Sequence, residues 1–81
     1  MATDHKLALY VTTGCPYCIK VKRLLADNGV TIPERNISTD AEAEQTLIAV
    51  GGKRQVPCLF IDGKPLYESS DIIAWVQENL L

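Results

Sequence analysis

The chain has 81 residues, 47% of them hydrophobic, and its eight Lys and Arg against ten Asp and Glu give a net charge of −2. This length allows a single domain over residues 1–81, since domains usually hold about 50 to 250 residues, and the apolar content excludes disorder over most of the chain. The charge argues against a protein that binds nucleic acid by neutralising phosphates.

The first half of the chain predicts a strand, a helix and a second strand. Residues 7–11 form a continuous apolar run, which is typical of a strand buried on both faces and central in its sheet. From Pro16 the apolar residues fall at helical spacing, and Asn28-Gly29 is a stop signal, so a helix is expected over residues 16–28. Residues 32–37 look extended, but Pro33 cannot donate to a ladder, which places this strand at a sheet edge.

A second helix is expected in the middle of the chain. Thr39 followed three residues later by Glu42 is a capping-box signature. The helix that it opens is predicted to run to about Val50 and to stop at Gly51-Gly52, because glycine favours helix C-termini.

The last third predicts a hairpin and a final helix. Residues 57–61 and 64–67 are strand-like and are joined by Asp62-Gly63, which favours a type I′ turn and therefore an antiparallel pair. Ser69 or Ser70 is the expected N-cap of the helix that follows. The order β-α-β-α-β-β-α predicts an α/β fold, in which three helices are distributed over both faces of a four-stranded mixed sheet.

The motif that carries chemistry is Cys15-Pro16-Tyr17-Cys18, at the junction of the first strand and the first helix. Cys15 would cap the helix, where unpaired backbone N–H groups and the positive end of the dipole stabilise a thiolate. Pro16 suits the first helical turn, and Cys18 returns to the same face three residues later. We expect Cys15 to be the nucleophile and Cys18 the resolving thiol.

A zinc site is the alternative for this motif, because two cysteines at this spacing also bind zinc. A structural zinc site needs four ligands, and the only further Cys and His residues in the sequence are Cys58 and His5. Cys58 lies in an apolar strand, where a free cysteine usually packs as a small hydrophobic residue. The cysteines therefore favour a redox-active pair, Cys15 and Cys18, and one residue of the apolar core, Cys58.

From residue 7 to about residue 80 the sequence resembles the glutaredoxins. Cys15-Pro16-Tyr17-Cys18 is similar to the dithiol motif of that family, Val56-Pro57 to its segment with a cis proline, and Ser69-Ser70-Asp71 to the opening of its last helix. The resemblance implies a thioredoxin fold and reduction of protein–glutathione mixed disulfides or protein disulfides. It also implies glutathione as the reducing co-substrate, and we expect no metal.

The resemblance also implies a glutathione site. Tyr17 would line it, the backbone of Val56 before Pro57 would pair with the cysteinyl part, and Ser70 with Asp71 would hold the γ-glutamyl end. Helix N-termini bind carboxylates, which supports the last assignment independently.

The sequence departs from the family pattern at two places. The family commonly has Lys or Arg where this chain has Thr12, so a cation near the thiolate is missing, and Lys53 or Arg54 is the candidate replacement. Tyr67-Glu68 replaces a Gly-Gly pair before the last helix. Glu68 and Ser69 are similar to a Glu-Ser pair in glutathione transferases, which implies that Ser69 shares the γ-glutamyl contact.

The function expected from the sequence is that of a dithiol glutaredoxin. Two alternatives stay open: a thioredoxin-like electron donor to ribonucleotide reductase, and a carrier in which Cys15 and glutathione from two chains hold a [2Fe–2S] cluster. The expected partners are glutathione and glutathionylated or disulfide-containing proteins, and we expect a monomer.

The expected compartment is the cytoplasm. The longest uncharged stretch, residues 7–19, falls short of the roughly 20 apolar residues of a membrane span. The N-terminus lacks the apolar segment and cleavage site of a signal peptide.

Overall fold

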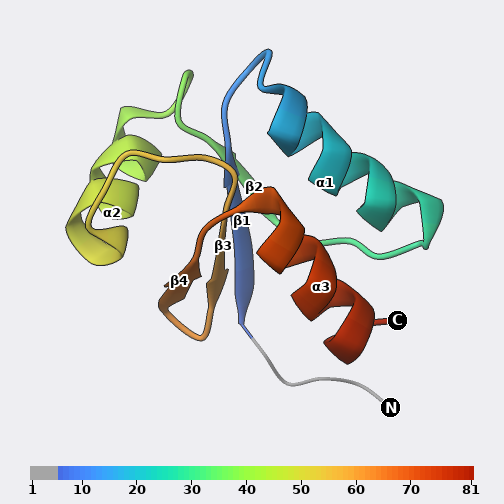
Figure 1. Cartoon of the computed structure of the whole chain (residues 1–81). Coiled ribbons are helices and arrows are strands. Elements are labelled where there is room, and N and C mark those ends of the chain that lie inside the picture. The colour runs from blue at the N-terminus through green and yellow to red at the C-terminus, as the bar shows by residue number, and fades with distance from the viewer. Residues whose placement is uncertain (1–5) are drawn as a thin grey trace.

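The computed structural model describes residues 6–81 as a central sheet with helices on both sides (Figure 1). The expected element order is confirmed: β1 (Leu7–Val11), α1 (Pro16–Asp27), β2 (Glu34–Asn36), α2 (Ala41–Gly51), β3 (Cys58–Ile61), β4 (Lys64–Leu66) and α3 (Ser69–Asn79). The N-terminal residues with His5, on which part of the zinc hypothesis and the signal-peptide argument depend, lie outside the described residues.

The sheet has the strand order β2-β1-β3-β4, so the apolar strand β1 is internal and β2 is an edge, as predicted. β1 is parallel to β2 and antiparallel to β3, which places Leu9 between Glu34 and Leu59. The β3–β4 pair is antiparallel. Its turn residues Asp62 and Gly63 have φ angles of 53° and 85°, as a type I′ turn requires.

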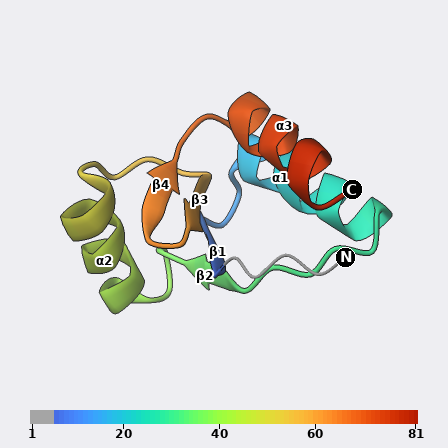
Figure 2. The ribbon, with the colours of Figure 1, turned by 90° about the horizontal axis from the view of Figure 1, so that it is seen from below.

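Two apolar cores lie on the two faces of the sheet. α1 and α3 pack side by side on one face, and α2 covers the other (Figure 2). The core on the α1–α3 face contains Leu9, Val11, Cys18, Val21, Leu25, Ile32, Leu59, Ile72 and Val76. The core on the α2 face contains Tyr10, Ile37, Ala43, Leu47, Cys58 and Phe60. β1 and β3 supply residues to both cores, which explains their continuous apolar sequences.

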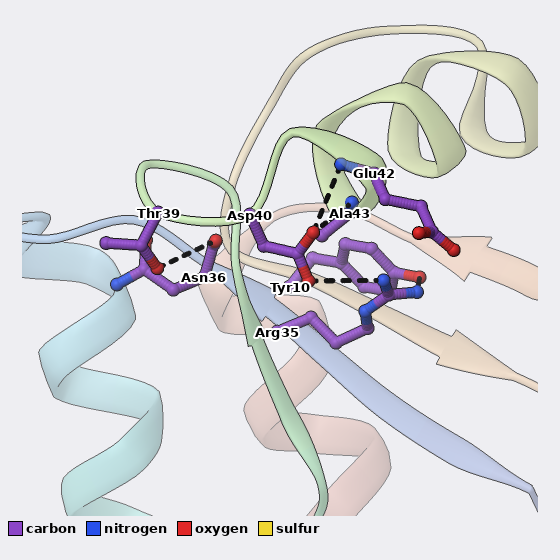
Figure 3. Close-up of polar contacts among 7 residues, drawn as sticks. All are labelled: Tyr10, Arg35, Asn36, Thr39, Asp40, Glu42 and Ala43. Carbon is purple, nitrogen blue, oxygen red and sulfur yellow. Dashed lines mark hydrogen bonds and ion pairs between the residues drawn. The ribbon is translucent and has the colours of Figure 1, made fainter.

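The predicted cap of α2 is wrong by one residue. The N-cap is Asp40, whose Oδ1 accepts the backbone N–H groups of Glu42 and Ala43 at 3.1 and 3.2 Å. Figure 3 shows the other side of this carboxylate facing Arg35, at 3.3 Å. The Ala43 N–H and the Arg35 guanidinium lower the pKa of Asp40 from its ordinary value. Bonds to a charged carboxylate are stronger than bonds to a hydroxyl, which explains why Asp40 displaces Thr39.

The predicted cap of α3 is also wrong. Glu68 occupies the N-cap position with a φ of 69°, and its side chain makes no capping hydrogen bond. Ser69 and Ser70 are instead the first two residues of the helix. None of the helices within residues 6–81 combines the length and apolar character needed to cross a membrane.

Candidate active site

Cys15 lies at the N-terminus of α1, directly after a turn that ends at Gly14 with a φ of 78°. Its backbone is extended and its Sγ accepts the N–H of Cys18 at 3.2 Å, so it is the helix cap that the sequence predicts. Pro16 occupies the first helical position, where no N–H is needed. The structure therefore places the partly buried Cys15 sulfur at the positive end of a 12-residue helix.

Cys18 is a different kind of thiol, because only 1% of its surface is exposed. Burial, and a hydrogen bond to Cys15, raise the pKa of Cys18 to about 12. At neutral pH it is a protonated thiol beside Cys15, and all three cysteines are free of disulfides. The Cys15 sulfur thus accepts a hydrogen bond from the backbone N–H of Cys18.

A cavity of about 450 Å³ opens beside this helix start. Five predicted ligand-binding residues line it, Tyr17, Val56, Pro57, Ser69 and Ser70. The Val56–Pro57 peptide is cis, as the family resemblance implied. The cavity is therefore lined from three separate segments: the beginning of α1, the end of the α2–β3 loop and the beginning of α3.

Two further residues line the cavity that sequence reasoning did not assign to it, Gln55 and Glu68. The Gln55 side-chain amide donates to Glu68 Oε1 at 3.3 Å, which joins the α2–β3 loop to the β4–α3 loop. A second bond joins the same loops, since the Tyr67 hydroxyl donates to the Lys53 carbonyl at 3.1 Å. The signals in the sequence were the departure from the family pattern at Tyr67-Glu68 and the similarity of Glu68-Ser69 to the Glu-Ser pair of glutathione transferases.

Glycine at position 51 makes room for that second bond. A Cβ at Gly51 would lie 2.3 Å from the Tyr67 hydroxyl oxygen. A larger residue at this position would displace the Tyr67 side chain and break its hydrogen bond to the Lys53 carbonyl.

Six of the predicted site residues do not line the cavity: the cysteines Cys15 and Cys18, and Thr12, Lys53, Arg54 and Asp71. The Thr12 hydroxyl is hydrogen-bonded to Ser38. Lys53 lies 4.5 Å from the centre of the Tyr67 ring, and Arg54 is paired with Glu44 at 2.7 Å. The two loop cations therefore have partners away from the cavity. Asp71 is exposed in the first turn of α3.

Cys58 is fully buried in the core on the α2 face, as its apolar surroundings predict. Burial raises the pKa of Cys58 to about 11. Cys18 belongs to the core on the opposite face, so the two do not meet. Within residues 6–81 the structure shows no group of three or more His, Cys, Asp or Glu side chains positioned to hold a metal.

The fold and the capping Cys15–Cys18 pair define a thiol protein of thioredoxin-like architecture. A structure described as a thioredoxin-like protein superposes with a TM-score of 0.78 at 29% identity, covering 94% of this chain and 100% of that one. The family model named Glutaredoxin matches residues 7–66. The chain belongs to the glutaredoxin family.

Curated relatives agree with this assignment. A probable glutaredoxin from Synechocystis is 36% identical over 75 residues, which are 91% of this chain and 85% of the relative. Glutaredoxin 1 from Rickettsia felis is 42% identical over 60 residues, 72% of this chain. This match spans only 59% of the rickettsial protein's length.

Proposed function

We propose that this protein is a dithiol glutaredoxin that reduces protein–glutathione mixed disulfides and protein disulfides at the expense of glutathione. The observation that carries the proposal is the Cys15 sulfur, which caps α1 and accepts the Cys18 N–H at 3.2 Å, at the end of the helix where Tyr17 lines the cavity. A sulfur held by helix N–H groups is stabilised as the thiolate, the form that attacks disulfides.

In the first step the Cys15 thiolate attacks the glutathionyl sulfur of a mixed disulfide. The bond between the two substrate sulfurs breaks, its electron pair leaves on the client protein's sulfur, and that thiolate takes a proton from solvent. Cys15 then holds glutathione as a mixed disulfide, and the client protein is reduced.

In the second step a thiolate displaces glutathione from Cys15. A second glutathione can attack the bound glutathionyl sulfur, forming glutathione disulfide and freeing Cys15. Alternatively, Cys18 attacks the Cys15 sulfur, which gives an internal disulfide that two further glutathione molecules reduce. The second route requires Cys18 to lose its proton, and its pKa of about 12, which is raised mainly by burial, works against that.

The cavity suits the expected glutathione contacts. The backbone of Val56, next to the cis peptide, lies in the cavity wall, where it can pair with the cysteinyl part. The first backbone hydrogen bond of α3 runs from Ile72 N–H to Glu68 O, so the N–H groups of Ser69, Ser70 and Asp71 are available to the γ-glutamyl carboxylate. Tyr17, with 63% of its surface exposed, lines the cavity from the first turn of α1.

The proposed partners are glutathione and proteins that carry glutathionylated or disulfide-bonded cysteines. The proposal places a monomeric protein in a reducing cytoplasm, where glutathione keeps free thiols such as Cys58 reduced.

The test is a coupled turnover assay with a glutathionylated peptide. Activity with glutathione and glutathione reductase, and none with thioredoxin reductase alone, supports the proposal. Activity that requires thioredoxin reductase and is indifferent to glutathione contradicts it.

That second outcome corresponds to a thioredoxin-like electron donor. Two observations favour this rival: the similarity to a thioredoxin-like structure and the engagement of Lys53 and Arg54 away from the cavity. The same assay, run with both reductases, separates the two functions.

A further inference from the structure

The loop between α2 and β3, residues 52–57, supplies Gln55, Val56 and Pro57 to the lining of the cavity. No residue of this loop belongs to a helix or a strand. Without the regular backbone hydrogen bonds of such elements, the position of the loop depends on its contacts with neighbouring segments. The contacts that hold it therefore decide the shape of this part of the cavity.

Tyr67 holds the beginning of the loop. Its hydroxyl donates to the Lys53 carbonyl at 3.1 Å, and the Lys53 ammonium lies 4.5 Å from the centre of its ring, within the range of a cation–π interaction. Tyr67 does not line the cavity, but it directly precedes Glu68, which does. One side chain therefore connects the loop to the segment that leads into α3.

The end of the loop is anchored to the core that Tyr67 also contacts. Val56 and Tyr67 both pack against the core on the α2 face, and Cys58 of that core directly follows Pro57. With this end anchored, the hydrogen bond at Lys53 fixes the beginning of the loop. The cavity-lining residues Gln55 and Val56 thus lie between two held points.

Gly51, the last residue of α2, leaves room for the Tyr67 hydroxyl. A Cβ at this position would overlap the hydroxyl oxygen, whereas the Tyr67 Cζ would be 3.4 Å away, an ordinary contact. Gly51 is not among the glycines with a positive φ, so its backbone does not require glycine. Alanine is the better helix residue, so the close approach of Tyr67 is what favours glycine here.

We propose that Tyr67 is a positioning residue that orders the α2–β3 loop for the binding of glutathionylated substrates, with Gly51 as the residue that admits its hydroxyl. This inference rests on the proposed function. Tyr67 acts through the backbone of the loop and touches neither the substrate nor the active-site thiols.

The first test is Tyr67→Phe, which removes the hydroxyl and keeps the ring beside Lys53. A loop that is ordered in only a fraction of the molecules weakens the apparent affinity by that fraction. KM for a glutathionylated peptide, with glutathione and glutathione reductase present, is expected to rise about two- to ten-fold, the factor that one net hydrogen bond corresponds to. kcat is expected to stay the same, because the Cys15 cap lies on α1. Hydrogen exchange measured by mass spectrometry is expected to be faster over residues 53–56.

The second test is Gly51→Ala, made with and without the Tyr67 hydroxyl. In the wild type, alanine displaces the hydroxyl, so KM is expected to rise as in Tyr67→Phe and Tm to fall. In the Tyr67→Phe background the nearest atom is 3.4 Å away, so alanine is expected to leave KM unchanged and to raise Tm through its helix propensity.

Tyr10→Phe is the matched control. It removes a hydroxyl from the same core, one that accepts a hydrogen bond from Arg35 at 3.3 Å and does not line the cavity. Tyr10→Phe is expected to leave KM and the exchange of residues 53–56 unchanged even where it lowers Tm. A rise in KM that merely follows the loss of stability would therefore appear in this control as well.

The outcomes separate this inference from the proposed function. If Tyr67→Phe changes neither KM nor the exchange of the loop, or if Gly51→Ala raises KM equally with and without the hydroxyl, the positioning role is wrong, while turnover by the wild type leaves the glutaredoxin activity standing. A wild-type protein that does not turn over the glutathionylated peptide with glutathione overturns the proposed function, and this inference with it.

Discussion

Glycine at position 68 should give a more stable protein than alanine at the same position. A non-glycine residue in the left-handed region, as Glu68 is at a φ of 69°, costs about 1 to 2 kcal/mol. Glycine avoids this strain but loses about 0.5 to 1 kcal/mol relative to alanine through its greater freedom in the unfolded chain. Glu68→Gly and Glu68→Ala both remove the carboxylate and its bond to Gln55, so their difference isolates the backbone. We expect the glycine variant to be more stable than the alanine variant by about 0.5 to 1 kcal/mol.

Thermal unfolding followed by circular dichroism, in the presence of a reductant, measures this difference. For a domain of this size it corresponds to a Tm higher by about 2 to 8 °C in Glu68→Gly than in Glu68→Ala. Gly52→Ala is the reverse control: Gly52 has a φ of 89° and open space where a Cβ would stand, so alanine there should lower Tm through backbone strain alone. If Glu68→Ala melts at the same temperature as Glu68→Gly or above it, the strain argument is wrong.

Two further predictions follow from the pKa shifts. Iodoacetamide at neutral pH should modify Cys15 first. Burial raises the pKa of Cys18 to about 12 and that of Cys58 to about 11, so these two thiols should react only after unfolding. Peptide mapping that finds Cys58 labelled as fast as Cys15 would refute this prediction. Asp40→Ala should lower Tm at neutral pH, because Asp40 caps α2 and pairs with Arg35. The pKa of Asp40 is lowered in the folded protein, so its contribution to stability is complete above the unfolded pKa near 3.9 and is lost as the pH falls below that value. The Tm values of the wild type and of Asp40→Ala should therefore converge as the pH decreases. A constant difference in Tm down to about pH 2 would argue against this role of Asp40.

The elements were predictable because their signals are local. The apolar run of β1, the Asp62-Gly63 turn and the thiol at the start of α1 each depend on neighbours within a few residues. The burial of Cys58 was predictable for the same reason, since its strand is apolar on both sides.

The helix caps and the cavity wall were harder, because contacts between distant segments decide them. Asp40 is as good a cap by residue type as Thr39, and its additional bond to Arg35 of β2 is not visible in the capping motif. The bond between Gln55 and Glu68 joins residues that the sequence separates by 13 positions. Lys53 and Arg54 were expected near the site because they precede Gln55-Val56-Pro57 in the chain, but the ion pair of Arg54 with Glu44 depends on how α2 packs.

The division of labour between the two active-site cysteines tests the central claim most directly. Cys18→Ser should keep substantial turnover of a glutathionylated peptide, because a second glutathione can resolve the intermediate, and should lose most of its reduction of an intramolecular protein disulfide. Intact-protein and peptide mass spectrometry of this variant after reaction with glutathione disulfide should find one glutathione, on Cys15. Equal loss of both activities, or glutathione on Cys58 and not on Cys15, would contradict the account.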